Sequence, residues 1–149
     1  MSAEIWPVTE GFAAEVGEVD LAKPISEADW ATIEEAYNTY SVLVFPDQHL
    51  EQEQHVEFAR RFGPIDRSMI VDMDADARVK PEIADVSNLT AKGEVMAADN
   101  RMLDFQRGNR LWHTDSSFKT GAVQILCVVS NRGAVFGRPN RVRGPARLL

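Results

Sequence analysis

Apolar residues recur at spacings of three and four between residues 27 and 40, and this period predicts an amphipathic helix. The residues on this spacing are Trp30, Ile33, Tyr37 and Tyr40. Ser26 stands directly before the helix as its expected N-cap. Glu27 and Asp29 place carboxylates in the first turn, where the helix dipole favours them. The pattern therefore predicts both the helix and its start.

A second helix is expected over residues 51–62, and it has a thinner apolar face. That face consists of Val56, Phe58, Ala59 and Phe62. A Gly-Pro pair at residues 63–64 ends the helix. Between the two helices, residues 41–45 form the β-branched run SVLVF, which Pro46 stops. A short continuous apolar run of this kind is typical of a buried strand.

Weaker patterns predict further extended segments. Residues 8–20 mix alternation with glycines and predict a strand and turn region, and residues 82–89 predict a strand. Residues 90–109 are expected to form a long connection, which in a compact domain is often functional. The alternating, aromatic-rich segment RLWHTDSSF, residues 110–118, predicts another strand. Strands and helices in this order indicate an α+β fold with helices packed on a sheet.

One histidine and one aspartate lie two residues apart on the last of these predicted strands. Side chains at i and i+2 of a strand point to the same face, so His113 and Asp115 would project together, beside Leu111. An imidazole and a carboxylate side by side are two ligands of the two-His-one-carboxylate site of non-heme Fe(II) oxygenases. The residues alone leave two alternatives open: a structural histidine on a partly apolar strand, and turn or cap chemistry in Asp115-Ser116-Ser117.

Several segments resemble the TauD/TfdA family of Fe(II)- and 2-oxoglutarate-dependent dioxygenases. The segments are GFAAEVGEVDLAKPIS, YSVLVFPDQHLEQEQHVEFARRFGPID, EIADVSN and NRLWHTDSSF, in the family's order from about residue 11 to residue 124. The form WHTDSSF is nearer to the family's 2,4-dichlorophenoxyacetate branch than to its taurine branch. The resemblance implies a double-stranded β-helix core (a jelly-roll, cupin-like fold) with flanking helices, here truncated to its N-terminal half.

The resemblance also implies roles for five residues. His113 and Asp115 resemble the first two iron ligands, with 2-oxoglutarate as the cosubstrate. Asn109 stands where the family often has an asparagine that faces substrate and cosubstrate, although an asparagine that caps a turn is an equal alternative. Ser68 and Val71 fall where family members contact substrate. The herbicide-type enzyme carries a lysine at the position of Val71, and a valine cannot pair with an anionic substrate.

The remaining histidines do not complete an iron site. His49 and His55 are expected to be solvated surface residues in a loop and a helix, and no histidine follows His113. The family's second iron histidine and the arginine that pairs with 2-oxoglutarate lie in the part of the family chain that has no counterpart here. No residue is therefore assigned a catalytic role beyond holding the metal.

Three functions are compared on these residues. The first is a dioxygenase that hydroxylates a small organic substrate with O₂ at Fe(II), incomplete in this chain. The alternative is a truncated, non-catalytic remnant that binds metal weakly. A hydrolase that uses Ser116 or Ser117 with His113 is disfavoured, because the sequence has no G-x-S-x-G nucleophile elbow.

The composition narrows the class of partner. The chain has 149 residues, a net charge of −7 and no apolar run near the roughly 20 residues that cross a bilayer. An acidic chain of this kind is not expected to bind nucleic acid or an anionic membrane. The N-terminus lacks the features of a signal peptide, and the single cysteine, Cys127, suits a reducing compartment, so a cytoplasmic protein is expected. A homo-oligomer is compatible with the sequence.

The charge changes sign near residue 124. Residues 1–124 carry 23 acidic and 11 basic residues, whereas residues 125–149 carry five arginines and no acidic residue. One interpretation is a basic, disordered tail. The other is an out-of-frame translation, because a shift of one nucleotide lets residues 137–147 spell GGQTEFADLR, which resembles a segment that follows the family's metal strand. The expected division is a TauD/TfdA-like part at 1–124 and an aberrant basic tail at 125–149, with low local order from about residue 131.

Overall fold

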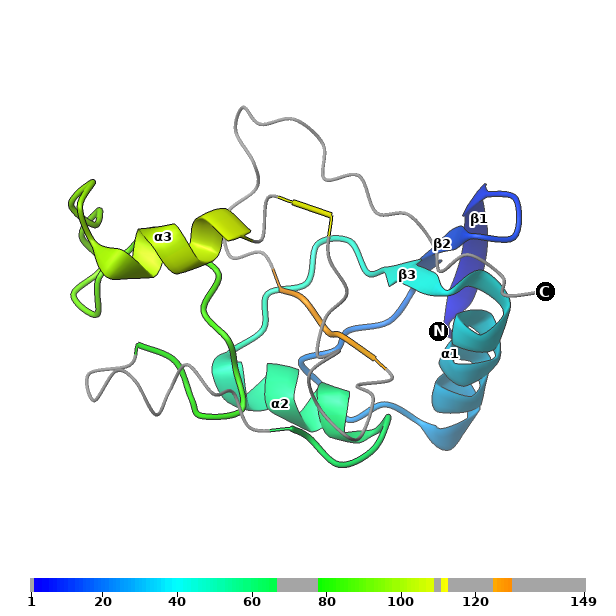
Figure 1. The fold of residues 1–149 in the computed structure, drawn as a ribbon. Coiled ribbons are helices and arrows are strands. Elements are labelled where there is room, and N and C mark those ends of the chain that lie inside the picture. Colours follow the sequence, from blue (N-terminus) through cyan, green and yellow to red (C-terminus); the bar gives the residue numbers. More distant parts are fainter. Residues whose placement is uncertain (1, 67–77, 109–110, 113–124, 130–149) are drawn as a thin grey trace. The chain divides into compact units, whose positions relative to one another are not determined.

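The computed structural model describes residues 2–66, 78–108, 111–112 and 125–129, which Figure 1 shows in colour. The described residues divide into two compact units: residues 2–55 and Val129 belong to the first, and residues 56–66, 78–108, 111–112 and 125–128 belong to the second. Across the described residues, no helix is long and apolar enough to span a membrane.

The first unit contains a three-stranded sheet with the order β1-β2-β3. Strand β1 (Glu4–Thr9) pairs antiparallel with β2 (Ala13–Gly17), and its register shifts between Pro7 and Thr9. Strand β3 (Val42–Val44) pairs parallel with β2. The strand and turn region predicted over 8–20 is thus a hairpin whose first strand begins four residues earlier than expected.

Glycine and threonine make the turn of this hairpin. Gly11 has a φ of 64°, in the left-handed region that costs glycine little. The hydroxyl of Thr9 accepts a hydrogen bond from the backbone N–H of Ala13 at 3.1 Å, and the Thr9 carbonyl accepts one from Phe12 at 3.4 Å. These bonds close the turn and start β2 at Ala13.

Helix α1 (Glu27–Tyr40) has the bounds that the sequence predicts, and its N-cap is confirmed. The hydroxyl of Ser26 accepts a hydrogen bond from the backbone N–H of Asp29 at 3.1 Å. At the other end Ser41 takes a φ of 54° and donates its backbone N–H to the Tyr37 carbonyl at 3.1 Å. This left-handed residue stops the helix and turns the chain directly into β3.

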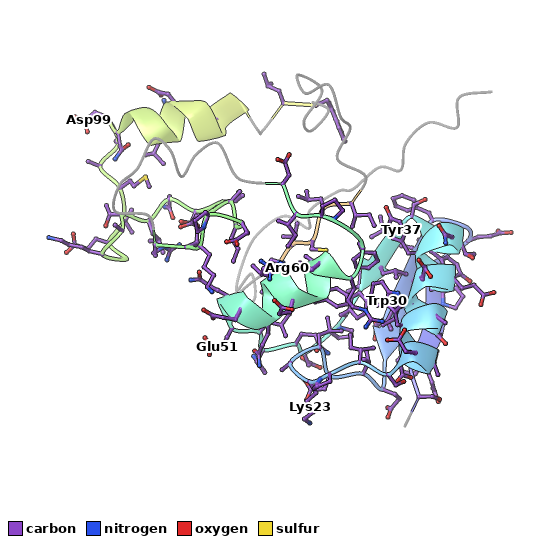
Figure 2. All side chains as sticks on the ribbon, turned by 90° about the horizontal axis from the view of Figure 1, so that it is seen from below. Lys23, Trp30, Tyr37, Glu51, Arg60 and Asp99 are labelled. Atoms are coloured by element: carbon purple, nitrogen blue, oxygen red, sulfur yellow. The ribbon has the colours of Figure 1, made fainter. Side chains whose placement is uncertain are left out.

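The core of the first unit lies between α1 and the sheet. Helix α1 contacts both β2 and β3, and Figure 2 shows Trp30 and Tyr37 along one side of this helix. The buried residues of the helix are Trp30, Ile33 and Ala36, and those of β2 are Ala14 and Val16. Strand β3 is less buried than the sequence predicts, and its Val44 side chain is 47% exposed. The strand lies at the end of the sheet order, where one edge has no strand partner among the described strands.

Two glutamine side chains fix the loops that follow β2 and β3. The Gln48 carbonyl oxygen accepts from Leu21 N–H at 2.8 Å, and its amide donates to the carbonyls of Val19 and Pro46, both at 3.0 Å. The Gln54 amide donates to the Ala22 carbonyl at 3.1 Å. Both glutamines therefore contribute to the fold through hydrogen bonds between their side-chain amides and the backbone of these loops.

Helix α2 (Gln52–Arg60) crosses the division between the units and is shorter than the predicted 51–62. Val56 and Phe58 are buried, and the ring of Phe58 meets the ring of Phe62 edge-on with centroids 5.5 Å apart. Glu51 precedes the helix, and its backbone N–H donates to the Gln54 side-chain oxygen at 2.8 Å. This return contact is half of a capping box.

The structure of the second unit differs from two predictions. Residues 82–89 form no strand, and only Leu89 makes an isolated antiparallel bridge, to Val95. The long connection predicted over 90–109 contains the helix α3 (Arg101–Gly108). The part of the chain that the structure describes is therefore a small α+β arrangement with one three-stranded sheet, and the jelly-roll core stays a prediction.

Candidate functional site

The five residues predicted to form or border the site are His113, Asp115, Asn109, Ser68 and Val71, and all of them lie outside the described residues. The described segments that flank them are residues 78–108, 111–112 and 125–129. These segments contain the helix and the loops that lead to the predicted site.

Helix α3 leads directly into the predicted metal segment. It ends at Gly108, whose carbonyl accepts a hydrogen bond from Leu111 N–H at 3.1 Å. Leu111 and Trp112 are 73% and 75% exposed and are not in a strand, so the strand predicted over 110–118 is wrong at these two residues. In the last turns of the helix, Arg107 pairs with Asp104 at 2.5 Å.

Two arginine side chains form ion pairs and hydrogen bonds with the loop residues that follow residue 77. The Arg78 guanidinium donates through Nε and Nη2 to one oxygen of Asp85 at 2.9 and 2.6 Å, and through Nη2 to the Ser87 hydroxyl at 3.0 Å. Arg60, at the end of α2, lies 3.5 Å from Glu82. Sequence reasoning missed these contacts because ion pairs between loop residues leave no periodic signal.

A tight turn follows, between Leu89 and Val95. The Thr90 N–H donates to the Glu94 carbonyl at 2.7 Å, and Gly93 N–H donates to the Thr90 carbonyl at 2.8 Å. Gly93 has a φ of 79°, which glycine adopts without strain. The Lys92-Gly93 pair between two apolar residues was the available sequence signal for this turn.

The other candidate metal-binding side chains do not gather in the described segments. Within these segments, no group of three or more His, Cys, Asp or Glu residues could hold a metal ion. His49 is exposed, as predicted, whereas His55 is half-buried on α2, so the expectation of a solvated residue fails there. Burial raises the pKa of the Cys127 thiol, which favours its protonated form at neutral pH.

Comparison with known proteins connects these segments to one family. The sequence matches the family described as "Taurine catabolism dioxygenase TauD, TfdA family" over residues 4–133. The matched range contains the H-x-D pair of His113 and Asp115 as well as the described units.

Individual relatives agree with the family match. The chain is 38% identical over 125 residues to the alpha-ketoglutarate-dependent 2,4-dichlorophenoxyacetate dioxygenase of Cupriavidus pinatubonensis, covering 83% of this chain and 44% of the relative. It is 36% identical over 135 residues to the (S)-phenoxypropionate/alpha-ketoglutarate-dioxygenase of Sphingobium herbicidovorans, covering 89% of this chain and 39% of the relative. The chain thus spans less than half the length of these relatives.

A solved structure is similar as well. The crystal structure of AAD-2 in complex with Mn(II) and N-oxalylglycine has a TM-score of 0.71 and 36% sequence identity to this chain. The similarity covers 80% of this chain and 42% of that protein.

Proposed function

Because the chain belongs to the TauD/TfdA family, we propose that it provides the N-terminal part of an Fe(II)- and 2-oxoglutarate-dependent dioxygenase that hydroxylates a small organic substrate. The observation that carries this proposal is the family match over residues 4–133, which includes the WHTDSSF segment. The cosubstrate is supported by the names of the relatives, which are alpha-ketoglutarate-dependent enzymes. The complex of AAD-2 with Mn(II) supports a divalent metal.

The donor chemistry of the sequence fits this metal. His113 would offer an imidazole nitrogen and Asp115 a carboxylate oxygen, which are two of the three ligands of the facial triad. The bound iron and cosubstrate would supply the oxidation of a C–H bond by O₂. Asn109 would lie beside substrate and cosubstrate, and Ser68 and Val71 would border the substrate. The strand proposed to hold His113 and Asp115 would belong to the proposed jelly-roll core.

The substrate is proposed from the relatives and modified by Val71. The relatives are named for phenoxy acids, whose ether and aromatic ring suit an apolar pocket. Val71 offers no positive charge for a carboxylate, so an uncharged or differently held substrate fits this chain better. O₂ and this small molecule are the proposed reaction partners.

Within these 149 residues no histidine follows His113, and the match covers 44% of the Cupriavidus relative. We therefore propose that the third ligand belongs to a part of the domain beyond the matched range, and that residues 1–149 alone turn over 2-oxoglutarate negligibly. The proposed division remains a family-like part at residues 1–124 and an aberrant basic tail at 125–149. Nucleotide sequence through codons 124 and 125 tests the tail: an uninterrupted frame without downstream GG-x-TEF coding in the next frame would reject the frameshift.

Metal binding tests the proposed site directly. Fe(II) should stabilise the purified chain against heat under anaerobic conditions, and His113→Ala and Asp115→Ala should each remove the effect. His49→Ala is the matched control, because His49 is exposed and lies outside the proposed ligand set. Stabilisation that survives in both ligand variants, or that disappears in His49→Ala, would refute the assignment.

A further inference from the structure

Strand β1 lies at one end of the sheet of the first unit, where no further strand pairs with it among the described residues (Figure 1). Of its six residues only Ile5 is half-buried, and Trp6 and Val8 are 44% and 61% exposed. The neighbouring strand β2 contains Ala14 and Val16, which have no exposed surface, and helix α1 contacts β2 and β3. The burial that stabilises this unit is therefore concentrated in α1 and β2 rather than in β1.

The pairing of β1 with β2 is also interrupted. Pro7 has no backbone N–H and donates no hydrogen bond to the sheet. The register shifts between Pro7 and Thr9, and such a shift disrupts the ladder locally. Regular pairing is thus confined to residues 4–7, which lie opposite residues 14–17. A short strand with little buried apolar surface is expected to open at a lower free energy than the core.

A carboxylate of α1 holds the residue that precedes β1. The backbone N–H of Ala3, a buried residue, donates to Oδ1 of Asp29 at 2.7 Å. The other carboxylate oxygen of Asp29, Oδ2, accepts a hydrogen bond from the Ser26 hydroxyl at 2.6 Å. Because Ser26 is the N-cap of α1, the helix cap fixes the position of the carboxylate that Ala3 binds. The bond between Ala3 and Asp29 is called the latch here.

The latch differs from the other contacts of β1. The Trp6 indole lies over Gly17 of β2, where an added Cβ would stand 2.2 Å from its Cζ3 atom. This contact and the turn that follows β1 both lie within the hairpin. The latch instead joins residues that are 26 apart in the sequence and ties the start of β1 to α1. Its ionised acceptor makes it stronger than a hydrogen bond between neutral groups.

We propose that β1 is a detachable strand, which opens from β2 while α1, β2 and β3 stay folded, and that the latch controls how often it opens. Opening frees the edge of β2 that β1 covers, and a free strand edge can pair with another extended segment. Strand β1 is thus a removable cover for β2. The inference uses contacts of the first unit alone, so it does not depend on the proposed function.

Native-state hydrogen exchange of the full 149-residue chain tests the proposal. In the wild type, the slowest amides of β1 should exchange at least about tenfold faster than the slowest amides of α1, because local opening needs no global unfolding. Asp29→Ala removes the latch and should accelerate exchange in β1 by about tenfold. Asp29→Asn keeps the shape and an acceptor oxygen without the charge, and should accelerate it less.

Ile33→Val is the matched control, because Ile33 has no exposed surface in α1 and would stay packed when β1 opens. This variant should accelerate exchange in α1 and leave β1 unchanged, since it lowers only the free energy of global unfolding. Three results would overturn the proposal: equal protection of β1 and α1 in the wild type, acceleration of both by the same factor in Ile33→Val, or β1 exchange that Asp29→Ala leaves unchanged. Far-UV circular dichroism checks that each variant is folded, and Asp29→Asn carries the test if Asp29→Ala is not.

Discussion

Among the polar residues of the first unit, Gln48 is the one whose substitution we expect to lower the free energy of unfolding most. Its side chain makes three hydrogen bonds to the backbone of two loops, with Leu21, Val19 and Pro46 at 2.8, 3.0 and 3.0 Å. The substitution Gln48→Glu keeps the shape and the oxygen that accepts from Leu21. It replaces the amide that donates to two carbonyls with a carboxylate oxygen, which repels them.

The magnitude follows from these contacts. Two lost hydrogen bonds cost about 0.5–1.5 kcal/mol each. A half-buried carboxylate facing two carbonyl oxygens adds roughly 1 kcal/mol, a value kept small because water still reaches the side chain. The expected loss in the free energy of unfolding is therefore about 3 kcal/mol near neutral pH. For a chain of this size, this corresponds to a lowering of Tm by roughly 6–12 °C.

The destabilisation caused by Gln48→Glu should depend on pH. The carbonyl oxygens favour the neutral acid, so the pKa of the introduced carboxyl is raised in the folded state. Stability is then lost as pH rises through that pKa and recovered as pH falls, because a protonated carboxyl can donate one hydrogen bond. Wild type and Gln48→Glu should therefore differ more at about pH 7 than at about pH 5.

Gln54→Glu is the matched control, because the same exchange meets a different environment. A carboxylate at position 54 still accepts from Glu51 N–H and lies in the first turn of α2, where the helix dipole favours it. It loses a single donated bond, to Ala22. Urea and thermal unfolding of both variants measure the difference. Equal losses, or a Gln48→Glu defect that is the same at both pH values, would refute the reasoning.

Three further outcomes are expected. Ile33→Ala removes a side chain with no exposed surface and should lower the unfolding free energy by about 2–5 kcal/mol; a loss below about 1 kcal/mol would contradict the assigned core. Gly17→Ala should displace the Trp6 indole and change its near-UV circular dichroism at a cost of about 1–2 kcal/mol; an unchanged spectrum would contradict the contact. The pKa of Asp29 is lowered by hydrogen bonds from Ser26 and then from the Ala3 N–H, so its contribution is present above the ordinary carboxyl pKa and is lost as pH falls. Asp29→Asn should remove that part of the acid-side dependence of Tm; an unaltered pH profile would argue against it.

Local signals explain which elements the sequence predicted correctly. The bounds of α1 were predicted because a period, a capping serine and two first-turn carboxylates lie within the helix and its cap. The prediction of a strand at 82–89 is wrong because a strand depends on its pairing partner, which need not be near it in the sequence. In that stretch the side chains of Asp85 and Ser87 bind Arg78 instead.

The site was less predictable than the helices for a related reason. The sequence does not reveal helix α3, because its eight residues are too few for a clear helical period. They also follow a glycine turn at Lys92-Gly93 and a polar segment within the same stretch, residues 90–109. The parallel pairing of β2 with β3 joins residues about 30 apart, and no local pattern encodes such a register. The H-x-D pair was recognised by resemblance, and the residues alone left structural and turn interpretations open.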